Sequence, residues 1–211
     1  MIWRCALAGL LFGAAGLMPA HADSIRIGTP LALTGALADE GKKQAAAYEL
    51  WLERVNAAGG IDVGGKKMKV ELVTYDYQTD GKRAQQLAEK LITDDKVHAL
   101  TAPFGSGHTK IVAGVAERYG IPVVASVASS ESVFDQGYKY LFGTLAPNGG
   151  LVDAMLATFL KEMPNVRKIA ILGRDDVFPR AMADAMREKA PKAELQVVYA
   201  EYYAVGTMDH S

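Results

Sequence analysis

The residues best suited to bind a ligand lie in the segment 102–109, where a short apolar run gives way to a helical pattern. The segment reads Ala-Pro-Phe-Gly-Ser-Gly-His-Thr. Backbone N–H groups in the first turn of a helix have no partner inside it, and together with the helix dipole they attract anions such as carboxylates. Gly105 would let a ligand approach the backbone, and Ser106 could add a hydroxyl donor. The alternative is that Ser106 is only the N-cap of the helix, beside glycines that form a tight turn.

A second polar segment, 126–131, follows the next expected strand and reads Ser-Val-Ala-Ser-Ser-Glu. Ligands of open α/β sheets bind at the edge where the carboxyl ends of the parallel strands meet, so this segment should lie beside the first. Its hydroxyl groups could hold a carboxylate, and its free carbonyl groups could accept from an ammonium. The sequence leaves open a turn into a short helix, with Glu131 completing a capping arrangement.

Phe178 is a third candidate, because it follows the run Gly-Arg-Asp-Asp at 173–176 after a later apolar strand. At the carboxyl end of that strand it could face a cleft between two lobes. An ordinary core residue at the start of a helix is the alternative, and the pattern does not separate the two.

Motifs for catalysis, nucleotide binding and metal binding are incomplete. The stretch 60–67 nearly spells a phosphate-binding P-loop, but Lys67 stands where the motif needs Ser or Thr and the stretch leads into a strand, so a turn is expected. No G-x-G-x-x-G occurs, and Ser106 lies in F-G-S-G-H instead of the G-x-S-x-G of a hydrolase. The histidines lack metal-ligand spacing. We therefore expect no enzyme, no cofactor and no metal.

The first 22 residues have the features of a cleavable secretory signal peptide: Arg4, an apolar run over 5–18 and Ala-His-Ala at 20–22. The only cysteine, Cys5, would leave with it, which excludes disulfides and thiolate chemistry. Removing 22 of 211 residues leaves 189, with 22 cations after the loss of Arg4 against 24 acidic groups, a net charge of −2. That charge argues against nucleic acid or anionic lipid as partner.

Strand-like and helix-like patterns alternate through the rest of the chain, which predicts parallel sheets covered by helices. We expect strands at 25–31, 69–76, 97–101, 122–125, 140–144, 168–172 and 195–203. Helices are expected at 42–58, after the cap Asp80, at 106–119 with Gly120 ending it, through 151–160 and at 181–189. The large side chains expected on buried helix stripes include Trp51, Tyr119, Met155, Phe159 and Met163.

The stretch 145–150 is the best candidate for a linker, because it contains Pro, Asn and two glycines. It divides the chain into an N-terminal ligand-binding lobe, 23–146, and a partial C-terminal lobe, 147–211. The expected fold class is thus α/β, with a Rossmann-like parallel sheet flanked by helices and an incomplete second α/β lobe. Two strands and two helices cover their sheet edges poorly, and 206–211 resembles the start of a helix that does not follow. We expect a chain that stops early, by truncation or frameshift.

Several motifs, in order, resemble one family. The segments 28–35 (Gly-Thr-Pro-Leu-Ala-Leu-Thr-Gly), 55–61 (Val-Asn-Ala-Ala-Gly-Gly-Ile), 104–109 and 120–122 (Gly-Ile-Pro) resemble the leucine/isoleucine/valine-type periplasmic binding proteins, the solute receptors of ABC importers. The resemblance runs from about residue 24 to the last residue. It implies the type I periplasmic-binding fold, in which a monomeric periplasmic protein closes around an amino acid and presents itself to permease subunits in the inner membrane.

The resemblance also implies roles for single residues in holding the polar end of an amino acid. Ser106 and Ser129 would donate to the ligand carboxylate, with Gly105 beside them. Ser130 is kept as their neighbour, because the loop register is open by one residue. The Val127 carbonyl would accept from the ligand ammonium.

The side chain of the ligand would be enclosed by aromatic residues. Phe104 would line this pocket, and Phe178 would cover the ligand from the second lobe. Glu40 stands where the family often has an aromatic wall. This departure implies a more polar pocket or a different ligand.

Members of that family are nearly twice as long as this chain, and they cross between lobes three times where this chain crosses once. The acidic residue that usually pairs with the ligand ammonium would lie beyond Ser211. A buried ammonium without its carboxylate costs several kcal/mol, so we expect this chain alone to bind weakly or not at all.

Three hypotheses for the function follow. The first is the binding component of an ABC importer for branched-chain or related small amphipathic amino acids. The second keeps the fold but makes it a sensing module for amides or other small carboxylates, coupled to a signalling partner, and the sequence does not separate it from the first. The third, a secreted α/β hydrolase using Ser106, lacks the nucleophile elbow and a His/Asp pair.

Overall fold

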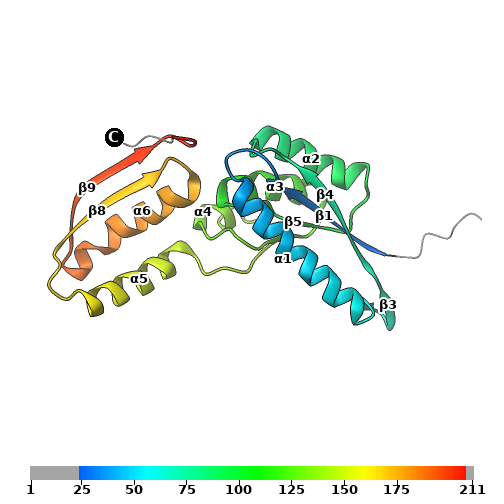
Figure 1. The fold of residues 1–211 in the computed structure, drawn as a ribbon, viewed down its shortest axis with the longest axis horizontal. Helices are drawn as coiled ribbons and strands as arrows, with labels where there is room; N and C mark the ends of the chain where they lie inside the picture. Colours follow the sequence, from blue (N-terminus) through cyan, green and yellow to red (C-terminus); the bar gives the residue numbers. More distant parts are fainter. Residues whose placement is uncertain (1–23, 208–211) are drawn as a thin grey trace, which may run out of the picture.

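The main sheet of the computed structural model is parallel throughout and has five strands in the order β4-β1-β5-β6-β7 (Figure 1). The structure describes residues 24–207, so the predicted signal peptide lies outside the described residues. The strands of this sheet are β1 (Ile25–Leu31), β4 (Val70–Asp76), β5 (Ala99–Thr101), β6 (Val123–Ala125) and β7 (Leu141–Gly143).

Helices cover both faces of this sheet, because the chain crosses from β1 to β4 in one direction and from β4 to β5 in the other. Right-handed crossovers in opposite directions place the helices on opposite faces. Helix α1 therefore covers one face, while α2 and α3 pack together on the other. These elements are α1 (Ala38–Ala57), α2 (Gly81–Thr93), α3 (Ser106–Tyr119) and the short α4 (Glu131–Phe134).

The predicted turn at 60–67 is the tip of a small antiparallel hairpin, β2 (Ile61–Val63) and β3 (Lys66–Met68). Gly64 and Gly65 form the turn with φ of 62° and 88°, a region that glycine adopts without steric cost. The stretch that resembles a P-loop is thus a turn that leads into a strand, as predicted.

The chain continues from β7 into a smaller α/β unit with the elements α5 (Asn148–Glu162), β8 (Lys168–Arg174), α6 (Val177–Lys189), a 3-10 turn η1 (Pro191–Ala193) and β9 (Gln196–Tyr203). Strands β8 and β9 pair in parallel, and Figure 1 shows α5 and α6 on the same side of this pair. Its buried residues form their own cluster of Val152, Leu156, Ala190 and Leu195, separate from the larger cluster around Leu91 and Leu100. Within residues 24–207 no helix has both the length and the apolarity to cross a membrane.

The predicted fold class is confirmed, and most predicted elements are present. Asp80 caps α2 by accepting from Arg83 N at 2.6 Å, and Gly120 ends α3 in the left-handed region. Helices α1 and α6 each begin four residues earlier than predicted, at Ala38 and Val177. The first turn of α1 is polar, and that of α6 contains Pro179, so neither start shows clearly in a search for apolar periodicity.

The predicted burial of several helical side chains is wrong. Trp51, Tyr119, Met155 and Met163 are all exposed, Met155 by 51%. The helical period shows which residues share a face, but not whether another element covers that face. Tyr119 turns outward, and its hydroxyl donates to Glu89 Oε1 at 2.8 Å.

Two helical leucines provide a matched test of this core. Leu91 in α2 is fully buried, whereas Leu50 in α1 is 48% exposed. Leu91→Ala should lower the free energy of unfolding by about 3 kcal/mol, since it leaves a cavity, and Leu50→Ala should lower it by less than about 1 kcal/mol. Urea unfolding followed by circular dichroism measures both, and equal losses would contradict the assigned core.

Candidate ligand-binding site

The two predicted loops lie side by side at the carboxyl edge of the main sheet, as predicted. Strands β5 and β6 pair in parallel with Leu100 opposite Val123, so the loops that leave them, 102–105 and 126–130, begin at the same level. Parallel pairing therefore places the start of α3 next to the second loop.

Helix α3 begins at Ser106 with Gly105 as its N-cap, and no side chain caps its first turn. The alternative prediction that Ser106 is the N-cap is therefore wrong. Gly105 has φ of 87°, and a Cβ at this position would meet no atom within 4 Å, so the backbone here borders open space. A helix start without a side-chain cap can offer its amides to an anion.

Three predicted serines and one unpredicted residue form a buried group, the serine–asparagine cluster: Ser106, Ser129, Ser130 and Asn148. Their exposed fractions are 1%, 2%, 0% and 0%. Ser106 Oγ accepts from Ser129 N at 3.4 Å and from Ser130 N at 3.3 Å. Ser129 Oγ donates to Asn148 Oδ1 at 2.6 Å, and Asn148 Nδ2 donates to Ser130 Oγ at 3.5 Å.

Asn148 enters the cluster because α5 starts directly beside the second loop. Its backbone N donates to Ser129 O at 2.9 Å. The sequence marked this residue only as part of a linker. The position of the linker could have indicated this role, because the linker follows β7, which ends at the same edge of the sheet as β6.

The start of α5 is also held by a carboxylate from the main lobe. Glu131 Oε1 accepts from Gly149 N at 2.7 Å, and an acidic group at a helix start is favourable because of the helix dipole. Lys189 Nζ from α6 donates to Gly149 O at 2.9 Å and to Asp153 Oδ2 at 2.6 Å. The predicted short helix after this loop is present as α4, but Glu131 caps α5 instead of α4.

The remaining predicted site residues do not join this cluster through any contact in the described part of the chain. Phe104 is half-buried and packs against the main core, and Val127 is half-buried in the second loop. Glu40 is half-buried in the first turn of α1. Phe178 is 38% exposed at the second position of α6.

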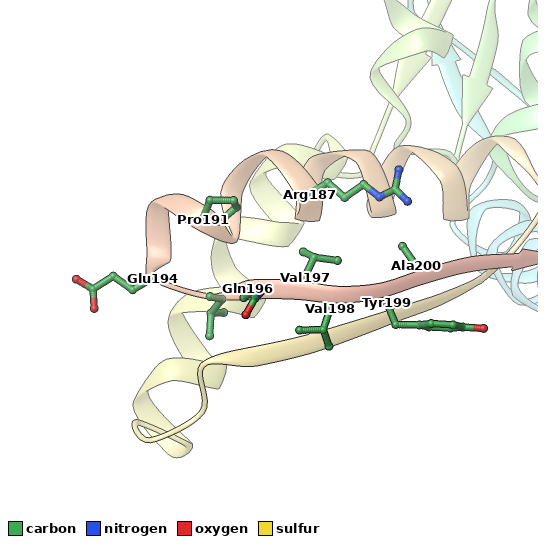
Figure 2. A pocket seen from close by; sticks show the side chains of 9 residues that line it. Arg187, Pro191, Glu194, Gln196, Val197, Val198, Tyr199 and Ala200 are labelled. Atoms are coloured by element: carbon green, nitrogen blue, oxygen red, sulfur yellow. The ribbon is translucent and has the colours of Figure 1, made fainter.

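Phe178 lines an apolar hollow of about 450 Å³ within the smaller unit, together with Met155, Phe159 and Met182. Another hollow runs along β9, and Figure 2 shows Arg187 and Pro191 on the α6 side of that strand, with Val198 and Tyr199 pointing away from α6. Neither hollow includes a member of the serine–asparagine cluster.

The start of α6 lies against the first turn of α3. A Cβ added at Gly107 would come within 3.2 Å of Asp176 Oδ1 and 3.5 Å of Val177 Cγ2. Asp176 also caps α6 by accepting from Val177 N at 2.7 Å. The smaller unit thus faces the carboxyl edge of the main sheet with an acidic side chain.

His108 and Tyr77 pack together next to this contact, with ring centroids 4.9 Å apart. Burial lowers the pKa of His108 below its ordinary value of 6.5. The negative charge of Asp176 raises this pKa, but its effect is smaller than that of burial. Burial likewise raises the pKa of Tyr77, whose hydroxyl has no hydrogen-bond partner in the described structure. Among residues 24–207, no group of three or more His, Cys, Asp or Glu side chains could hold a metal ion.

The fold and this edge together define an α/β protein of the type I periplasmic-binding class. The family model described as periplasmic binding protein matches residues 24–211, so the chain belongs to the periplasmic binding protein family. This finding confirms the resemblance that the motifs indicated.

Individual relatives agree with this assignment. The chain is 30% identical over 210 residues to Leu/Ile/Val-binding protein homolog 8 of Brucella suis, covering 96% of this chain and 51% of that protein. It is 25% identical to the leucine-, isoleucine-, valine-, threonine- and alanine-binding protein of Pseudomonas aeruginosa, covering 89% and 49%. The crystal structure of the substrate-binding protein LivJ of Streptococcus pneumoniae in complex with isoleucine matches with a TM-score of 0.75 and 26% identity, covering 89% and 51%. The chain spans about half the length of these relatives.

The lowered pKa of His108 predicts a loss of stability in acid. Because the folded state disfavours the charged imidazole, the unfolded state binds more protons as the pH falls below about 6.5, and the free energy of unfolding decreases. His108→Gln should therefore lose less stability than the wild type between pH 7.5 and pH 5. Urea unfolding at both values measures this difference, and an unchanged pH dependence would contradict the buried neutral histidine.

Proposed function

We propose that this chain is the ligand-binding component of an ABC importer for branched-chain or related small amphipathic amino acids. The observation that carries this proposal is the meeting of the hydroxyl-bearing loop 126–130 with Ser106 at the uncapped start of α3. Hydroxyl and amide donors at a helix start suit the carboxylate of an amino acid.

The names of the relatives support the class of ligand. One is named as a homolog of the Leu/Ile/Val-binding protein, another as a leucine-, isoleucine-, valine-, threonine- and alanine-binding protein, and LivJ was solved with isoleucine. We place the ligand carboxylate near Ser106, Ser129 and Ser130 and the ammonium near the Val127 carbonyl. Phe104, Phe178 and Glu40 remain proposed pocket residues, and Gly105 a proposed point of backbone approach.

A binding role without catalysis is part of the same proposal. The family is one of binding proteins, and Ser106 accepts two hydrogen bonds from backbone amides instead of bonding to a histidine. A serine nucleophile needs a base within hydrogen-bond reach. We therefore infer that the chain is not an enzyme.

Location and partners follow from the importer role. We propose a monomer in the periplasm, with lobes at 23–146 and 147–211, whose ligand-bound form is recognised by the permease subunits. The separate buried clusters of the main sheet and of the smaller unit support this division. Closure of two lobes on a ligand is a hinge-type change that a partner can detect.

The carboxylate is the part of the ligand on which this proposal depends most. Leucine, isoleucine and valine should each bind, weakly for this chain, whereas leucinol, which lacks the carboxylate, should not. Ligand-observed saturation-transfer NMR on the 211-residue chain detects weak binding. Equal signals for leucine and leucinol would contradict a carboxylate site, and a signal for leucinol alone would contradict the proposed ligand class.

Ser106 and Ser132 form a matched pair of serines for mutation. Ser106 is buried at the start of α3, whereas Ser132 is exposed in α4. Ser106→Ala should weaken isoleucine binding by about tenfold, because a hydrogen bond to a charged group is lost, and Ser132→Ala should leave binding unchanged. Titration of both variants with isoleucine measures the affinities, and their thermal midpoints show whether each variant is folded. Equal affinities of the two variants would contradict a role of Ser106 in the site.

A further inference from the structure

The strongest hydrogen bond of the serine–asparagine cluster is the one between Ser129 and Asn148. Its length of 2.6 Å lies at the short end of the range for O–H···O bonds, whereas the other hydrogen bonds that involve side chains of the cluster measure 3.3 to 3.5 Å. The bond is fully buried, and an acceptor in that position is costly to remove without replacement.

Asn148 offers the serines the same chemistry as a carboxylate. Its Oδ1 is an sp² oxygen that accepts from a serine hydroxyl, just as a carboxylate oxygen does. The side-chain amide also donates from Nδ2 to Ser130 Oγ, which leaves the Ser130 proton free. Since a hydroxyl has only one proton, Ser129 cannot donate to Asn148 and to a ligand at the same time.

The burial of the three serines also indicates that a ligand and Asn148 compete for the same place. None of them is more than 2% exposed, and Asn148 at the start of α5 is itself completely buried beside them. The Ser129 hydroxyl can donate to a ligand carboxylate only if the side chain of Asn148 moves away from it. The open space at Gly105 borders the loop that leads into the cluster.

We propose that Asn148 is an affinity-setting residue of the ligand site, whose side-chain oxygen takes the hydrogen bond from Ser129 that a ligand carboxylate would take. The inference rests on the proposed function. A ligand that binds must displace the amide from Ser129, and the cost of breaking this bond lowers the affinity for the ligand. Because Asn148 begins α5, the exchange also releases one of the contacts that hold α5 to the second loop.

Glu131 provides the control, because its carboxylate also connects the second loop to α5 but, within residues 24–207, makes no hydrogen bond to a serine side chain of the cluster. Its carboxylate binds Gly149 N, one residue beyond Asn148. Glu131→Gln therefore weakens the junction between the loop and α5 but leaves the Ser129 hydroxyl bound. A purely structural role for Asn148 predicts that mutations at both positions change binding in the same direction.

The test is isoleucine titration of the full 211-residue chain and three variants by isothermal calorimetry, with thermal midpoints recorded. Asn148→Ala should bind isoleucine about tenfold more tightly than the wild type, since the net contribution of one hydrogen bond is removed from the competing state. Asn148→Asp should bind it more weakly, because the new carboxylate occupies the site more strongly and repels the ligand. Glu131→Gln should not bind more tightly than the wild type.

The outcomes separate this inference from the proposed function. Tighter binding by Asn148→Ala, including binding that appears only in this variant, supports both. Binding by the wild type with equal or weaker binding by Asn148→Ala overturns the inference alone. Isoleucine binding by none of the four proteins overturns the proposed function, and the inference with it.

Discussion

Parallel pairing of β5 with β6 is the constraint on which the site depends. It makes both strands end at one edge of the sheet, so that the start of α3 and the loop 126–130 meet there. A helix start needs acceptors for its amides, and a buried loop needs partners for its own polar groups. The polar groups of the loop are bound by Ser106 Oγ, which accepts from two loop amides, and by Asn148, which accepts from Ser129 Oγ, whereas no side chain of the described residues caps the start of α3.

The contact between the two parts of the chain uses the same edge. Asn148 and Gly149 at the start of α5 bind the second loop and Glu131, while Asp176 at the start of α6 lies against Gly107. Three helix starts therefore lie at this edge, and those of α3 and α5 contribute Ser106 and Asn148 to the serine–asparagine cluster. Within this cluster the Ser129 hydroxyl has an internal acceptor, Asn148 Oδ1.

The fold could be predicted because its signals are local. The strand periods, the cap Asp80 and the glycine at the end of α3 each determine a boundary from a few neighbouring residues. Burial was predicted less well, since Met155 and Trp51 have helical spacing but no element that covers them. Ser106 and the second loop could be found from the β-α pattern, whereas Asn148 could not, because its partner lies 19 residues away and only the tertiary fold brings the two together.

The account depends most on the binding of a carboxylate at the start of α3. Amide chemical shifts of the ¹⁵N-labelled chain during titration with isoleucine test this directly. The account predicts that the largest shifts occur at Ser106, Gly107, Ser129 and Ser130. Shifts confined to the apolar hollow around Phe178, with these four amides unchanged, would contradict it.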